Sequence, residues 1–127
     1  MKLIRKLIAL AAIAASAQVM AETFDDYDVR TTESLIELCG VSVGDPAYEA
    51  AMGFCLGYID AALDYHAALT AGSKSDAIAC PDNTVSREQI VVVVVDWSRR
   101  NTQHLKSEVP VHGVMRAIVE KWPCSGQ

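Results

Sequence analysis

Four cysteines carry the most evident chemistry of this chain: Cys39, Cys55, Cys80 and Cys124. Thiols can bind zinc, act as nucleophiles or form disulfides. Zinc-binding cysteines usually come in closely spaced pairs, and no such pair occurs in this sequence. All four cysteines follow an N-terminal segment of the export type (residues 1–21), and an even number of cysteines in an exported chain predicts disulfides, which leave no thiol for catalysis. We therefore expect two disulfides and no metal site.

The acidic residues and histidines give weaker evidence for a catalytic or metal-binding site than the cysteines do. Asp60 and Asp64 are four residues apart and could form a carboxylate pair, but two acids on the solvent side of an amphipathic helix are the ordinary pattern. His66, His104 and His112 lack the spacing of paired metal ligands, and His66 lies on an apolar stripe, where core histidines are common. No nucleophile elbow, phosphate loop or zinc-protease motif is present. We expect no catalytic residue and no cofactor.

A polar segment over residues 99–106 is the best candidate for a binding element. Loops that a rigid scaffold positions are common binding elements, and this one gathers cationic groups in an acidic chain. The alternative is a polar turn whose arginines stabilise the negative end of the preceding helix. The sequence leaves both interpretations open. The candidate residues are Arg99, Arg100, Asn101, Gln103, His104 and Lys106.

Helices must position this segment, because apolar residues recur at spacings of three and four along most of the chain. The first predicted helix covers 32–39 and stops at Gly40. The fourth begins near 107–110 and ends before Pro123. Because short connections make consecutive helices antiparallel, the four helices predict a small all-α, four-helix domain that two disulfides hold together.

The second helix has the clearest boundaries. Asp45 is a natural N-cap, Pro46 a natural first residue, and Gly72 a natural end. Gly53 and Gly57 are four residues apart, so this flank of the helix can approach a neighbouring backbone closely.

The third segment is ambiguous. The run from Ile90 to Val95 consists of β-branched residues, whose propensity favours a buried strand. Ser86 and Gln89, however, have the spacing of a capping box. A lone strand could not satisfy its backbone hydrogen bonds, and no second strand-like run exists. We therefore predict a helix over about 86–100.

Helix order favours one of the three disulfide pairings that four cysteines allow. Cys39 and Cys55 flank the turn between the first two helices. Cys80 precedes the third helix and Cys124 follows the fourth, so an antiparallel hairpin would bring them together. We expect Cys39–Cys55 and Cys80–Cys124, with the other pairings left open.

The N-terminus has the parts of a secretory signal peptide over residues 1–21. Basic residues precede a short apolar run from Leu7 to Ala15, and small residues permit cleavage after Ala21 or, as an alternative, Ala17. We expect a periplasmic protein with a loose acidic leader (22–31), a single domain (32–127) and no membrane insertion after cleavage. The net charge of −5 disfavours nucleic acid as a partner.

Several short motifs follow one another in order through the chain. They are Phe54-Cys55-Leu56-Gly57-Tyr58-Ile59-Asp60, Cys80-Pro81, Thr84-Val85 at the start of a capped helix, and Trp122-Pro123-Cys124. This order resembles the Rap/Tai family of immunity proteins from bacterial type VI secretion systems. The resemblance runs from about Ser34 to Cys124.

The resemblance implies a small periplasmic helical protein, often a homodimer, that blocks a cell-wall amidase effector. In that family a loop between helices plugs the effector's catalytic groove, and the matching segment here is Arg99–Lys106. Many relatives carry His-Pro in this loop, where this chain has Asn101-Thr102. We expect a toxin inhibitor and no enzyme. The alternative is a general periplasmic accessory or chaperone-like protein without a toxin partner, and a small hydrolase ranks third.

Overall fold

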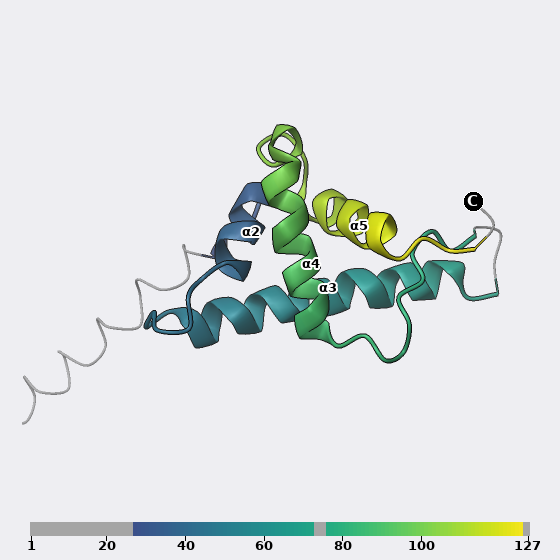
Figure 1. Ribbon diagram of the computed structural model, residues 1–127, viewed down its shortest axis with the longest axis horizontal. Helices are drawn as coiled ribbons and strands as arrows, with labels where there is room; N and C mark the ends of the chain where they lie inside the picture. Colours follow the sequence, from purple (N-terminus) through teal and green to yellow (C-terminus); the bar gives the residue numbers. More distant parts are fainter. Residues whose placement is uncertain (1–26, 73–75, 126–127) are drawn as a thin grey trace, which may run out of the picture.

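The structure, a computed structural model, describes residues 27–72 and 76–125. Within these residues it has four α-helices, one short 3-10 helix and an isolated β-bridge between Ala79 and Pro123. Figure 1 shows α4 crossing the long α3, with α2 on one side of α4 and α5 on the other. The predicted all-α fold is therefore confirmed, whereas the predicted signal peptide lies outside the described residues. The elements are α2 (Thr32–Cys39), α3 (Tyr48–Thr70), α4 (Arg87–Arg100), η2 (Thr102–His104) and α5 (Pro110–Lys121).

The third predicted segment is a helix, α4. Ser86 Oγ accepts the backbone N–H of Gln89, and Gln89 Oε1 accepts the N–H of Ser86, which completes the predicted capping box. Ile90, Val94 and Trp97 recur at helical spacing and are almost fully buried. Burial of this face outweighs the modest β propensity of the valines.

The start of α3 differs from the prediction. The helix begins at Tyr48 with Ala47 as its N-cap, and Asp45 and Pro46 precede it. Asp45 Oδ1 accepts the N–H of Ala47 at 2.8 Å, so Asp45 organises the turn before the helix instead of capping it. Gly72 follows the helix with φ of 66°, a conformation in which glycine carries no steric penalty.

Gly53 and Gly57 do not approach a neighbouring backbone closely. A Cβ atom at either position would meet no described atom within 4 Å, and both glycines are exposed. Close approach occurs at Gly113 of α5 instead, where a Cβ would lie 2.1 Å from Thr32 Cγ2. Gly113 therefore allows α5 to pack directly on the first residue of α2.

Two disulfides join the helices, in the pairing that the helix order favours. Cys39–Cys55 links the end of α2 to α3, and both cysteines are buried in the core. Cys80–Cys124 closes the other end of the α4–α5 hairpin, where Cys80 N also donates to Trp122 O at 2.8 Å. The candidate segment lies at the opposite end of this hairpin from Cys80–Cys124, between the end of α4 and the start of α5.

Candidate functional site

The connection between α4 and α5, residues 101–109, is fixed at its base by α2. The first N–H groups of a helix have no partner within that helix. Here Thr32 N donates to Glu108 O and Glu33 N donates to Leu105 O, both at 2.8 Å. The Thr32 hydroxyl also donates to the carbonyl of Val109 at 3.2 Å. Carbonyls of the connection thus satisfy the start of α2, and the backbone of the connection is held in one position.

Glu108 organises the interior of the connection. Its two carboxylate oxygens accept hydrogen bonds from Nε and Nη2 of Arg116, each at 2.9 Å. His104 Nδ1 lies 3.0 Å from Glu108 Oε1. The hydrogen bond from Arg116 is the main reason why the pKa of Glu108 lies below its ordinary value of 4.5. A bidentate pair of this kind fixes the orientation of both side chains.

His104 and Asn101 face inward. The ring of His104 stacks on buried Trp97, with 6.1 Å between the ring centroids. Asn101 follows the last residue of α4, and its Nδ2 donates to Trp97 O at 2.9 Å. This bond satisfies one of the carbonyls that the end of a helix leaves without an N–H partner. Both side chains therefore support the connection from within.

Replacing Glu108 by glutamine should remove part of the acid dependence of stability. Because the pKa of Glu108 is lowered in the folded protein, its contribution is complete above 4.5 and is lost as the pH falls through the lowered value. The difference in free energy of unfolding between wild type and Glu108→Gln should therefore shrink from neutral pH to about pH 3. Urea unfolding at several pH values measures this difference, and exposed Glu37→Gln is the control. A difference that stays constant with pH would contradict the role of Glu108.

The predicted arginines lie outside the connection itself. Arg99 and Arg100 occupy the last turn of α4. Arg99 Nη1 pairs with Asp96 Oδ1 at 2.7 Å, and Arg100 Nη1 pairs with Glu120 Oε1 at 3.0 Å. Both positions suit the negative end of a helix, as the alternative interpretation stated.

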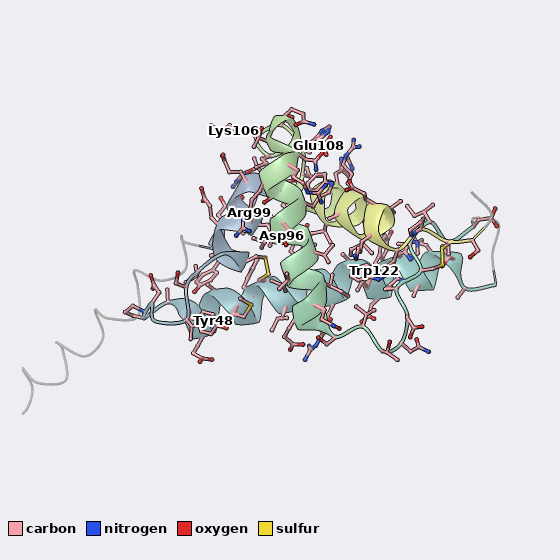
Figure 2. All side chains as sticks on the ribbon, in the orientation of Figure 1. Tyr48, Asp96, Arg99, Lys106, Glu108 and Trp122 are labelled. Carbon is pink, nitrogen blue, oxygen red and sulfur yellow. A yellow bond between two sulfur atoms is a disulfide. The ribbon has the colours of Figure 1, made fainter. Side chains whose placement is uncertain are left out.

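Gln103 and Lys106 are the candidates that the connection presents to solvent. Both are exposed, and Lys106 makes only a long ion pair, 3.8 Å, with Glu33 among the described residues. Figure 2 shows Lys106 and Glu108 at the top of the view, beside the end of α4, and Arg99 with Asp96 lower on α4. The six sequence candidates thus divide into two outward residues, two inward supports and two arginines on α4.

A shallow hollow of about 550 Å³ lies beside the connection. The connection contributes Asn101 and His104 to its lining, and α5 contributes Met115, Arg116 and Val119. The connection and the hollow together form a surface with a polar projection beside a recess that both apolar and charged side chains line. Protein partners commonly anchor side chains in such recesses.

The other chemically interesting groups have structural partners. Asp60 Oδ2 accepts a hydrogen bond from Arg87 at 2.6 Å, and His66 Nε2 accepts one from the N–H of Ile78 at 3.2 Å. All four cysteines form disulfides. In residues 27–72 and 76–125, no group of three His, Cys, Asp or Glu side chains could hold a metal ion. These groups build the scaffold of the described part of the chain.

Comparison with family models identifies the family of this chain. Residues 31–124 match the model for Rap1a immunity proteins. No curated protein and no solved structure matches the chain. Among the described helices, none is long and apolar enough to cross a membrane. Because the match covers most of its length, the chain belongs to the family of Rap1a immunity proteins.

Proposed function

We propose that this protein binds and occludes a peptidoglycan amidase effector of a type VI secretion system. The observation that carries the proposal is the connection between α4 and α5, which is held from within and presents Gln103 and Lys106 outward. Membership of an immunity protein family supplies the partner class, a toxin. That this toxin is a peptidoglycan amidase is the more specific part of the proposal.

Occlusion requires shape and hydrogen bonding, and no bond is made or broken. Gln103 can both donate and accept hydrogen bonds, and Lys106 donates from a cationic ammonium group. A connection that is already ordered loses little conformational entropy when it enters a groove. The hydrogen bonds of Thr32 and the pair between Glu108 and Arg116 therefore favour tight binding, because they hold the connection in place before the partner arrives.

The disulfides and the family also bear on the cellular compartment of the protein. The two disulfides and the family indicate a location outside the cytoplasm. We place the protein in the periplasm, where a cell-wall amidase would act and where the signal peptide predicted over 1–21 would direct it.

A capture experiment tests the proposal. The immobilised, disulfide-bonded protein is exposed to secreted and periplasmic proteins of the producing bacterium, and captured proteins are assayed on purified peptidoglycan. We expect one amidase at near-equal molar yield, with its activity abolished in the complex. Recovery of many unrelated proteins would instead support the accessory or chaperone-like role, and recovery of none would contradict the proposal.

Changing the outward residues should weaken this complex without unfolding the protein. We expect the double variant Gln103→Ala, Lys106→Glu to bind the captured amidase at least about tenfold more weakly, as loss of a central contact does. Its thermal midpoint should stay near that of wild type, since both side chains are exposed. Lys121→Glu, at the far end of α5, is the matched control and should bind normally. Unchanged affinity of the double variant would remove the connection from the interface.

A further inference from the structure

The hollow beside the connection has hydrogen-bond donors that no described residue uses. His112 and Arg116 lie one turn apart on α5, and both line the hollow. Arg116 donates to Glu108 from Nε and Nη2, whereas its Nη1 has no partner among the described residues. Within residues 27–72 and 76–125, the imidazole of His112 makes no hydrogen bond or ion pair. An imidazole carries at least one N–H whether it is neutral or protonated, so both side chains can donate to a ligand.

The acidic groups next to these donors already have cationic partners. Glu120 lines the hollow and pairs with Arg100 at 3.0 Å, and Glu108 pairs with Arg116 at 2.9 Å. The formal charges of these two pairs cancel, in a chain whose net charge is −5. A negatively charged ligand would therefore meet less repulsion here than beside unpaired acids.

Apolar side chains form the rest of the lining. Ile78, in the segment between α3 and α4, is 42% exposed, and Met115 and Val119 of α5 are half-buried. Figure 1 shows α5 beside α4, and the hollow lies between these two helices and the connection. Its volume of about 550 Å³ lies in the range of pockets that hold small ligands. The hollow thus has room for an apolar group next to a polar one.

We propose that this hollow binds an acidic residue of the toxin together with an adjacent apolar side chain. The inference rests on the proposed function, because the toxin supplies the acidic segment. The carboxylate accepts hydrogen bonds from Arg116 Nη1 and from the ring of His112, and the apolar neighbour packs on Ile78 and Met115.

Two features of the site favour this ligand. Glu108 fixes the orientation of the Arg116 guanidinium, so little conformational freedom is lost when a second carboxylate binds to it. Asn101 and His104 belong to the connection and also line the hollow, so one partner can cover both. The connection then enters the toxin, and the hollow receives a side chain from it.

A pair of dipeptide probes tests the site without the toxin. Acetyl-leucyl-glutamate amide carries a carboxylate beside an apolar side chain, and acetyl-leucyl-glutamine amide has nearly the same shape without the charge. Two-dimensional NMR of the isotope-labelled, disulfide-bonded protein should show millimolar binding of the glutamate probe, with the largest shifts over residues 112–119. The glutamine probe should bind at least about fivefold more weakly, because hydrogen bonds to a charged group are stronger. Equal affinities, no binding, or shifts centred elsewhere would overturn the proposal.

Changing the charge at position 112 tests the role of His112. His112→Glu should weaken binding of the glutamate probe at least about fivefold, because the two carboxylates repel each other. His112→Arg keeps a donor and should bind this probe at least as well as wild type. His112 is exposed, so both variants should keep the thermal midpoint of wild type. Val43→Glu adds the same charge at a position that is 78% exposed and outside the lining, and it should bind the probe normally.

The captured amidase extends the test to the partner. His112→Glu should weaken its complex about tenfold, whereas Val43→Glu should leave the affinity unchanged. Normal binding of the amidase by His112→Glu would overturn the assignment of the hollow to the toxin. If no amidase is captured and the glutamate probe still binds, the proposed function fails while the carboxylate site is supported.

Discussion

Replacing Cys80 and Cys124 by serine is expected to lower the free energy of unfolding by about 4 kcal/mol. The bond closes a loop of 44 residues, and by the chain-entropy model a cross-link of this length restricts the unfolded chain by that amount. The whole free energy of unfolding of a small domain is about 5–15 kcal/mol, so the loss of this disulfide removes a large share of it. The thermal midpoint should fall by about 15 °C or more. Urea unfolding of the variant and the wild type at neutral pH measures the loss.

The buried disulfide provides the comparison. Cys39–Cys55 closes a loop of 16 residues, which corresponds to about 3 kcal/mol from the cross-link. Because both cysteines are buried, Cys39→Ala with Cys55→Ala should lose core contacts in addition. Cys80 is exposed, so its substitution removes the cross-link with little loss of core contacts. A loss below about 1 kcal/mol for the Cys80–Cys124 variant would contradict the entropic account.

Local signals in the sequence were sufficient to predict most of the fold. The capping box of Ser86 and Gln89 identified α4 correctly, because capping depends on residues three apart in the chain. The ends of α2 and α5 were also predictable from Gly40 and Pro123. Asp45 was misassigned because the same side chain can cap a helix or organise a turn before it.

The candidate site could be predicted only in outline. The sequence pointed to residues 99–106, but the ion pair between Glu108 and Arg116 depends on the position of α5 relative to the connection. The stacking of His104 on Trp97 likewise requires the end of α4 to be in place. Residue type alone could not separate the outward Gln103 and Lys106 from such inward supports. The available signal was the opposite charge of Glu108 in the connection and Arg116 in the middle of α5.

The tight contact of α2 with α5 could not be predicted from the sequence. Because of it, we expect Gly113→Ala to lower the free energy of unfolding, although helix propensity alone would raise it. From helix propensity alone, Gly113→Ala should raise the free energy of unfolding by up to about 1 kcal/mol. In this fold the new Cβ would lie 2.1 Å from Thr32 Cγ2 and 2.7 Å from Thr32 Oγ1. Thr32 is fully buried and hydrogen-bonded to the connection, so it cannot turn aside freely. We expect a net loss of about 2 kcal/mol in the free energy of unfolding, as overpacking typically causes.

A double variant and a matched control test whether the clash with Thr32 causes the loss of stability in Gly113→Ala. Thr32→Ala removes both atoms that the new Cβ would meet first, so it should recover part of the loss in the Gly113→Ala background. Alone, Thr32→Ala should destabilise by about 1 kcal/mol, through its lost hydrogen bond to Val109 O. Gly57→Ala makes the same substitution in α3 where nothing lies within 4 Å, and it should stabilise the protein. If Gly113→Ala stabilised the protein as Gly57→Ala does, α5 would have room to move away from α2. The base of the connection would then be less firmly held than the hydrogen bonds of Thr32 indicate.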